Sequence, residues 1–353
     1  MVYTKKQISM LLEKVAKRMT SIDSAGMQEG CPISIINFET WEWAQGVGMY
    51  GLYKFYEETG SKEHLEFLTS WYDRRIKEGL PEKNVNTMSP MLTLAHLCEV
   101  TGNESWLELC KEWAAWVMYE MPRTEEGGLQ HVISGGLNDG QLWDDTLFMT
   151  VLFLAKMGRI LDREDYLEES VRQFLVHIKY LYDKNSGLWF HGWTFNGRHN
   201  FADALWARGN CWYTAGVVDY IEMIDLRGGV RQYLLDTLNA QVRKLEEIQE
   251  ADGMWHTLLD DPNSYVETSA TAGFGYGILK AVRNGYIDPK YLEIGKKALN
   301  AVLQRIDDNG TVQQVSYGTG MGKDLDFYRN IDICPMTYGQ ALAIMLLSEG
   351  MKL

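Results

Sequence analysis

An all-α fold is expected from the sequence, in the form of an (α/α)6 barrel whose six helical hairpins close into a ring. Apolar residues recur at helical spacing, the helices fall into two kinds, and a glycine-containing turn returns about every 60 residues. The chain has 353 residues, of which 46% are hydrophobic, and can therefore bury a large core. With only 7 prolines and no linker-like tract, a single domain over residues 1–353 is expected.

The first kind of helix has one apolar face. In segment 104–121, apolar side chains follow one another every three or four residues, with Glu and Lys opposite. Segments 1–19 and 162–182 share this pattern. Glu13 and Lys14 interrupt the apolar residues of the first segment, which indicates an amphipathic helix and not a secretory signal.

The second kind of helix is apolar on all sides. Segments 91–98, 146–155 and 337–347 contain no Asp, Glu, Lys or Arg. Such helices are typically enclosed by other helices. The two kinds together indicate an outer layer that faces water and an inner layer that does not.

A turn motif connects these helices: acidic residue, Gly, apolar or aromatic residue, then His or Gln. It occurs at 125–131, 183–193, 250–256 and 307–314. Its glycines, taken as Gly128, Gly187, Gly253 and Gly310, are 59, 66 and 57 residues apart. Each interval holds one helix of each kind, and roughly six such units fit the chain. An open solenoid is the alternative, but it would expose the apolar helix near the C-terminus, so closure is favoured.

Charge and cysteine usage exclude several partners. Lys and Arg number 34 against 48 Asp and Glu, a net charge of −14, which disfavours nucleic acid and anionic membranes. There is no apolar run long enough to span a bilayer. The 5 cysteines, Cys31 among them, are odd in number and lack a CxxC pair, which suggests buried thiols and a cytoplasmic location. The histidines outside the turn motifs show no ligand spacing, so a metal site is not expected. No organic cofactor is expected either.

Tryptophans gather in the turns and at helix starts, where they could surround a funnel at one end of the ring. Indole faces stack on the C–H groups of sugar rings, which indicates a carbohydrate site. The alternative is that these side chains are wedges between helices. The tryptophans are Trp41, Trp43, Trp143, Trp189, Trp193, Trp206, Trp212 and Trp255.

Two adjacent carboxyl groups, Asp144 and Asp145, open the apolar helix of segment 146–155. Desolvation there should raise the pKa of at least one of them, so that it holds a proton near neutral pH and can act as an acid. Helical spacing does not choose between the two, and capping of the helix explains one of them equally well.

Positive and donor groups lie near the same tryptophans. Arg208 could hold a carboxylate in a bidentate fork or stack on an indole, and His191 could donate to a ligand. A structural salt bridge and a hydrogen bond within a turn are the alternatives. The segment GTGMG at 318–322 is not a phosphate loop, because no GxGxxG pattern or preceding strand is present. It is expected to form a turn or a backbone wall of the funnel.

Several motifs, in order along nearly the whole chain, resemble glycoside hydrolase family 105, the unsaturated rhamnogalacturonyl hydrolases. They are WEWAQGV (41–47), KNVNT (83–87), PMLTL (90–94), QLWDDTLFM (141–149), SGLWFHGW (186–193), WAR with Trp212 (206–212) and SYGTG (316–320). The resemblance implies an (α/α)6 barrel, which agrees with the repeat count. It also implies a small unsaturated oligosaccharide as the binding partner.

The resemblance implies a hydration reaction. In this family an Asp protonates C4 of a 4,5-unsaturated uronic acid, water adds at C5, and the hemiketal opens and releases the next sugar. The acid is the second residue after Trp in a WxD motif, which corresponds to Asp145. The implied substrate-binding residues are Trp41, Trp43, Asn86, His131, Trp143, Asp144, His191, Trp206, Arg208 and Trp212.

The identity of the next sugar stays open at this point. The chain departs from the family's pattern at two places, both on substrate loops. His131 is followed by Val132, where relatives often have Lys, and only 12 residues separate Trp193 from Trp206, where relatives often have a longer insertion. Rhamnose and sugars derived from ulvan or arabinogalactan are alternatives. Other functions on the same fold are an ordinary glycosidase, a sugar epimerase or a non-catalytic carbohydrate-binding protein.

Overall fold

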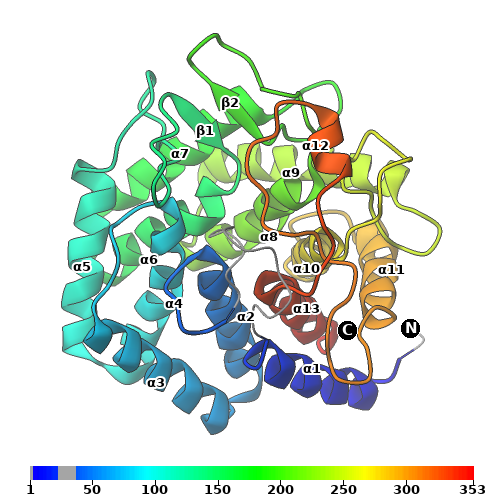
Figure 1. Ribbon diagram of the computed structural model, residues 1–353, viewed down its shortest axis with the longest axis horizontal. Helices are drawn as coiled ribbons and strands as arrows, with labels where there is room; N and C mark the ends of the chain where they lie inside the picture. The colour runs from blue at the N-terminus through cyan, green and yellow to red at the C-terminus, as the bar shows by residue number, and fades with distance from the viewer. Residues whose placement is uncertain (1–2, 23–36) are drawn as a thin grey trace.

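Two concentric layers of helices make up the protein (Figure 1). The computed structural model describes residues 3–22 and 37–353. The inner helices are α2 (Trp43–Thr59), α4 (Val85–Thr101), α6 (Leu152–Ile160), α8 (Ala207–Met223), α10 (Thr268–Arg283) and α13 (Thr337–Gly350). The outer helices are α1 (Lys5–Met19), α3 (Lys62–Glu78), α5 (Glu104–Tyr119), α7 (Glu164–Leu181), α9 (Gly228–Ile248) and α11 (Leu292–Leu303).

The inner helices form a closed ring. Each contacts the next in the order α2, α4, α6, α8, α10 and α13, and α13 contacts α2. Each outer helix packs mainly on one inner helix: α3 on α2, α5 on α4, α7 on α6, α9 on α8, α11 on α10 and α1 on α13. Helices α5 and α11 also touch the next inner helix, α6 and α13 respectively. The predicted (α/α)6 barrel is confirmed, and the open solenoid is excluded because the first and last inner helices touch.

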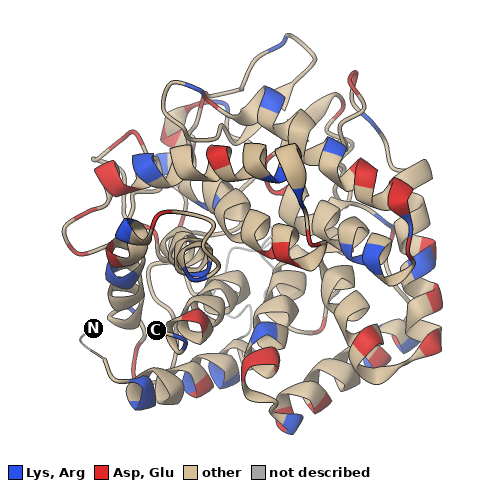
Figure 2. Ribbon diagram, turned by 180° about the vertical axis from the view of Figure 1, so that it is seen from behind, with Lys and Arg blue, Asp and Glu red and all other residues tan. Residues whose placement is uncertain are grey.

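Burial separates the two layers as the sequence pattern predicts. Every residue of α13, and of α4 from Val85 to Cys98, is buried. In α1 the buried residues occupy one face, for example Ile8, Leu12 and Val15. Charged residues of both signs lie along the outer helices (Figure 2). The acidic surface and the apolar ring are thus carried by different helices.

The recurring turn has a structural purpose that the sequence did not reveal. Its glycine has a positive φ in all four copies, and in the first copy this residue is Gly127 (φ 74°) and not Gly128. A Cβ on Gly187, Gly253 or Gly310 would lie within 2.8 Å of a backbone carbonyl oxygen of α9, α11 or α1, respectively. These turns therefore need glycine both for the backbone angle and for close packing against an outer helix.

The turns run from outer helices to the N-terminal ends of inner helices, and a small sheet joins two of them. Strand β1 (Gln141–Trp143) pairs antiparallel with β2 (Gly192–Thr194), so that Trp143 lies opposite Gly192. A π-helical turn, η2 (Leu147–Val151), precedes α6. The remaining elements are the 3-10 helix η3 (Pro289–Tyr291) and the short helix α12 (Leu325–Arg329).

Four cysteines are free thiols: Cys98, Cys110, Cys211 and Cys334. Cys31 lies outside the described residues. Within residues 3–22 and 37–353, no helix combines the length and the apolar composition that a bilayer span requires.

Ring closure depends on a close approach between α2 and α13. A Cβ on Gly51 of α2 would lie 2.9 Å from the Cα, Cβ and O atoms of Ala341 in α13. Gly51→Ala should therefore lower the free energy of unfolding by about 1–3 kcal/mol, measured by urea denaturation. Gly229→Ala is the matched control, because no atom lies within 4 Å of the added methyl group. An equal effect of both substitutions would contradict this account of closure.

Candidate active site

A pocket opens where the N-terminal ends of the inner helices meet. Trp43 begins α2, Asn86 lies in the first turn of α4, and Trp206 precedes α8. Asp145 stands just before η2 and α6. Helix N-termini carry partial positive charge, so this end of the ring favours an anion despite the acidic surface.

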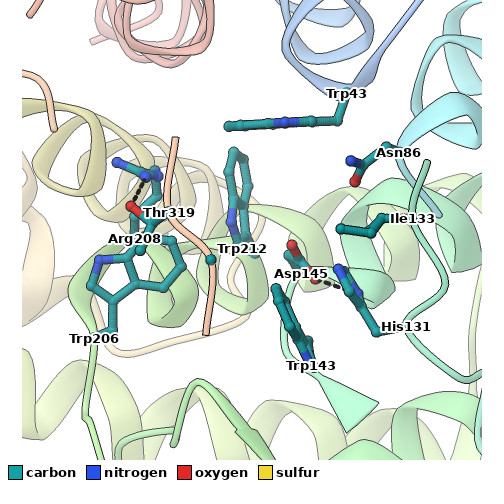
Figure 3. Close-up of a pocket in the computed structure, with 11 residues that line it drawn as sticks. Trp43, Asn86, His131, Ile133, Trp143, Asp145, Trp206, Arg208, Trp212 and Thr319 are labelled. Atoms are coloured by element: carbon teal, nitrogen blue, oxygen red, sulfur yellow. Dashed lines mark hydrogen bonds and ion pairs between the residues drawn. The ribbon is translucent and has the colours of Figure 1, made fainter. Parts of the chain in front are cut away.

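The pocket has a volume of about 500 Å³, including solvent at its mouth. In Figure 3, Trp206 and Arg208 face Asn86, Ile133 and His131 across the pocket, with Trp43 and Trp143 above and below. The lining residues are Trp43, Asn86, His131, Ile133, Trp143, Asp145, Trp206, Arg208, Trp212, Thr319 and Gly320.

Asp145 is the one acidic side chain among the described residues that line the pocket. Its side chain is 20% exposed, and burial raises its pKa from 3.8 to about 7, against the opposing charge of Arg208. A carboxyl group with this pKa holds its proton in an appreciable fraction of molecules at neutral pH. It can therefore act as a general acid.

His131 and Trp143 form one side of the pocket around Asp145. Their rings are stacked, with centroids 3.9 Å apart and an interplanar angle of 7°. Nδ1 of His131 lies 3.2 Å from Oδ1 of Asp145 and 3.0 Å from Oγ1 of Thr146. Burial lowers the pKa of His131 well below its ordinary value, so the ring is neutral. It therefore adds no positive charge that would lower the pKa of Asp145.

Arg208 organises the opposite side. Its Nη1 donates to the backbone oxygen of Ser316 at 3.0 Å, and its Nη2 donates to Tyr317 O at 2.9 Å and to Thr319 Oγ1 at 2.8 Å. The guanidinium also lies over the ring of Trp206, 4.6 Å from its centroid. The predicted stacking on an indole is present. The N–H groups of the guanidinium, which were expected to bind a ligand carboxylate, mostly donate to residues 316–319 instead. Arg208 thus contributes its charge and fixes a wall of the pocket.

Trp41 does not lie on the pocket wall, contrary to the expectation from the sequence. Its ring stacks on Trp71 in the core, with centroids 5.3 Å apart, and its Nε1 donates to Thr87 O at 2.7 Å. Trp189 and Trp255 of the turn motifs are also fully buried between helices. These three tryptophans are therefore wedges between helices, the alternative left open by the sequence. The sequence could not separate the two roles, because an indole packs equally well against another ring and against a sugar.

Asp144 and His191 lie behind the pocket surface, and each is only 1% exposed. Asp144 is pressed against the first turn of α8, where a Cβ on Gly209 would lie 2.0 Å from its Oδ2. Burial and the adjacent Asp145 raise the pKa of Asp144 well above its usual value. His191 lies edge-on to Trp143 and beside Trp206, with centroid distances of 5.3 and 4.3 Å. Direct contact of Asp144 or His191 with a ligand is therefore not supported.

Three lining residues were not among the predicted binding residues. Thr319 and Gly320 belong to the segment that was expected to form a turn or backbone wall, and they do form a wall. Ile133 follows His131 by two residues and carries no chemical signal that could have marked it. Among the described residues, no group of three or more His, Cys, Asp or Glu side chains could hold a metal ion.

Comparison with known proteins identifies the class of protein that this ring and pocket represent. The profile of Glycosyl Hydrolase Family 88 matches residues 13–353, and the chain belongs to this family of hydrolases. It is 31% identical over 355 residues to the unsaturated rhamnogalacturonyl hydrolase YesR of Bacillus subtilis strain 168, a match that covers 100% of this chain and 97% of that protein.

Two crystal structures show the same fold at higher identity. Both are described as possible members of family GH105, which agrees with the resemblance found in the sequence. The protein from Salmonella enterica serovar Paratyphi A is 46% identical, with a TM-score of 0.96 over 99% of this chain and 95% of that chain. The protein from Klebsiella pneumoniae is 47% identical, with a TM-score of 0.95 over 99% and 94% of the two chains.

The raised pKa of Asp145 has a consequence for stability. A carboxyl group whose pKa is higher in the folded state stabilises the fold at low pH, and this stabilisation is lost as the pH rises through about 7. The free energy of unfolding of Asp145→Asn minus that of the wild type should therefore increase by about 2–3 kcal/mol when the pH is raised from 5 to 8. Urea denaturation at the two pH values measures this change. A stability difference that is independent of pH would contradict the assigned burial of Asp145.

Proposed function

We propose that this hydrolase removes a 4,5-unsaturated uronic acid from the non-reducing end of small oligosaccharides produced by polysaccharide lyases. One observation carries the proposal: a single carboxyl group, Asp145, lines an aromatic pocket and has a pKa raised by burial to about 7. The name of the relative from Bacillus subtilis supports a substrate of this class.

The proposed chemistry begins with the proton of Asp145. The π electrons of the C4=C5 bond take this proton at C4, and the ring oxygen stabilises the positive charge that develops at C5. Water then adds at C5 and gives a proton back to the Asp145 carboxylate. The resulting hemiketal opens: the bond between C5 and the ring oxygen breaks, the C5 hydroxyl becomes a ketone, and its proton passes to the ring oxygen, which leaves a hemiacetal at C1. The hemiacetal then collapses to an aldehyde at C1 and releases the next sugar as an alcohol. One side chain thus acts first as acid and then as base.

The walls of the pocket suit such a substrate. The uronate carboxylate is expected on the side of Arg208, whose charge lies at the N-terminal end of α8. Trp43, Trp143 and Trp212 offer aromatic faces for sugar rings, and Asn86 offers hydrogen bonds on the opposite side. Rhamnose is our first candidate for the next sugar, because the relative from Bacillus subtilis is named an unsaturated rhamnogalacturonyl hydrolase.

An ordinary glycosidase mechanism has less support. Displacement at the anomeric carbon uses two carboxyl groups that flank the scissile bond. Among the described residues that line the pocket, Asp145 has no second carboxyl opposite it. Membership of a hydrolase family also disfavours a non-catalytic carbohydrate-binding protein. Hydration of a double bond needs one acid and fits the pocket better.

We also propose that the protein works in the cytoplasm. The free thiols of Cys98, Cys110, Cys211 and Cys334 are consistent with a reducing compartment. Small unsaturated oligosaccharides would have to be imported before this enzyme could act on them.

The first test compares the two adjacent carboxyl groups. Asp145→Asn should lower kcat by about 10²–10⁴-fold, because the variant has no proton to give to C4. Asp144→Asn, the matched control, should lower kcat by about tenfold or less, since Asp144 lies behind the pocket surface. The assay follows the loss of ultraviolet absorbance of the double bond with a lyase-generated disaccharide. Wild-type activity of Asp145→Asn, or equal losses in both variants, would reject the role of Asp145.

The second test is the pH dependence of the wild-type enzyme. Because Asp145 must be protonated to act, kcat/KM should be constant below pH 7 and should fall about tenfold per pH unit above about pH 7. A rate that rises with pH through this range would mean that the ionised carboxylate is the active form, and would contradict the hydration mechanism.

A further inference from the structure

Part of the pocket wall is a loop and not a helix. Residues 316–329 lie between the last turn motif and α13, and they include Thr319 and Gly320 of the pocket and the short helix α12. Arg208 holds the first part of this loop, residues 316–319. The part from Met321 onward does not contact Arg208 in this way and has a different anchor, Tyr328.

Tyr328 is fully buried, in a small apolar cluster with Ala204, Trp206 and Leu258 that is separate from the main core. Its hydroxyl oxygen lies 2.7 Å from Nδ1 of His191 and accepts a hydrogen bond from the amide of Gly322 at 3.1 Å. Tyr328 thus connects the loop to the histidine that lies beside Trp143 and Trp206.

The hydrogen atoms in this network can be assigned by counting donors and acceptors. Burial raises the pKa of Tyr328, so its hydroxyl keeps its proton and must donate it. The acceptors within reach are Nδ1 of His191 at 2.7 Å and the sulfur of Met321 at 3.6 Å, and a thioether is the weaker acceptor. The hydroxyl therefore donates to His191, and Nδ1 accepts.

The tautomer of His191 follows from this assignment. Burial and the charge of Arg208 lower the pKa of His191 to about 3, so the ring is neutral and carries one proton. Because Nδ1 accepts, that proton is on Nε2. Nε2 is buried and has no hydrogen-bond partner among the described residues. In this tautomer neither ring nitrogen of His191 is free to act as a base, because Nε2 carries the proton and Nδ1 accepts from Tyr328.

The same hydroxyl also fixes the middle of the loop, at Met321 and Gly322. The Gly322 amide is tied to it, and the methyl group of Met321 lies against Gly192, where an added Cβ would be 2.3 Å away. Gly192 is paired with Trp143 in the small sheet. One tyrosine therefore links the loop wall, the histidine ring and the strand that leads to Asp145.

We propose that Tyr328 is a positioning residue of the active site, whose hydroxyl holds His191 in the Nε2–H tautomer and anchors Met321 and Gly322, which directly follow Gly320 of the pocket wall. The effect on catalysis rests on the proposed function, whereas the tautomer does not.

The direct test is ¹⁵N NMR of the histidine-labelled wild-type protein, with His191→Gln used only to assign the signal. His191 should show a protonated Nε2 and an unprotonated Nδ1 at neutral pH. In Tyr328→Phe the Nε2–H tautomer should lose its preference, and kcat/KM should fall by about 10- to 100-fold on a lyase-generated disaccharide.

Tyr220→Phe is the matched control, because Tyr220 is equally buried and its hydroxyl lies 2.9 Å from Ser170 Oγ, between α7 and α8. This variant should keep the wild-type His191 signals and kinetics. A proton on Nδ1 in the wild type, or identical kinetics in the two variants, would overturn the proposal. The wild-type spectrum decides the tautomer even if Tyr328→Phe does not fold. An inactive wild-type enzyme would reject the proposed function and leave that spectrum informative.

Discussion

Removal of one carboxyl group from water is the constraint on which the rest of this structure depends. Asp145 can hold a proton at neutral pH because burial beside the stacked rings of His131 and Trp143 removes solvent around it, and this effect outweighs the nearby backbone amides and Arg208, which favour the ionised form. Arg208, which opposes this effect, has most of its hydrogen bonds directed to the loop at 316–319. The site therefore combines a nearby positive charge, which suits the anionic substrate we propose, with an acid that keeps its proton in an appreciable fraction of molecules at neutral pH.

The closed ring provides this environment. The contact of α13 with α2 brings together side chains from the beginning, middle and end of the chain, and the N-terminal ends of the inner helices meet on one side. The small sheet then sets Trp143 and Asp145 beside the second turn motif. Two adjacent buried carboxyl groups cost stability at neutral pH, which is common where a site is arranged for chemistry and not for stability.

The fold could be predicted from the sequence because its signals are local. The predominantly apolar segments 91–98 of α4 and 337–347 of α13 carry no charged residue and require enclosure, and the spacing of the turn motifs sets the number of hairpins. The site could be predicted only in part. Trp41 and Trp43 are of the same type and two residues apart, yet one stacks on Trp71 and the other lines the pocket. Residue type does not reveal which neighbour a ring will meet. The choice between Asp144 and Asp145 likewise depends on where η2 begins and on the packing of Asp144 against Gly209.

The protonation state of Asp145 can be measured without any substrate. A ¹³C NMR titration of the aspartate side-chain carboxyl carbons, with the signal assigned by its absence in Asp145→Asn, reports this group alone. The account predicts a midpoint near pH 7 for Asp145. A midpoint near the ordinary aspartate value of about 3.9 would mean that the group is ionised at neutral pH and has no proton to transfer, and would contradict the account.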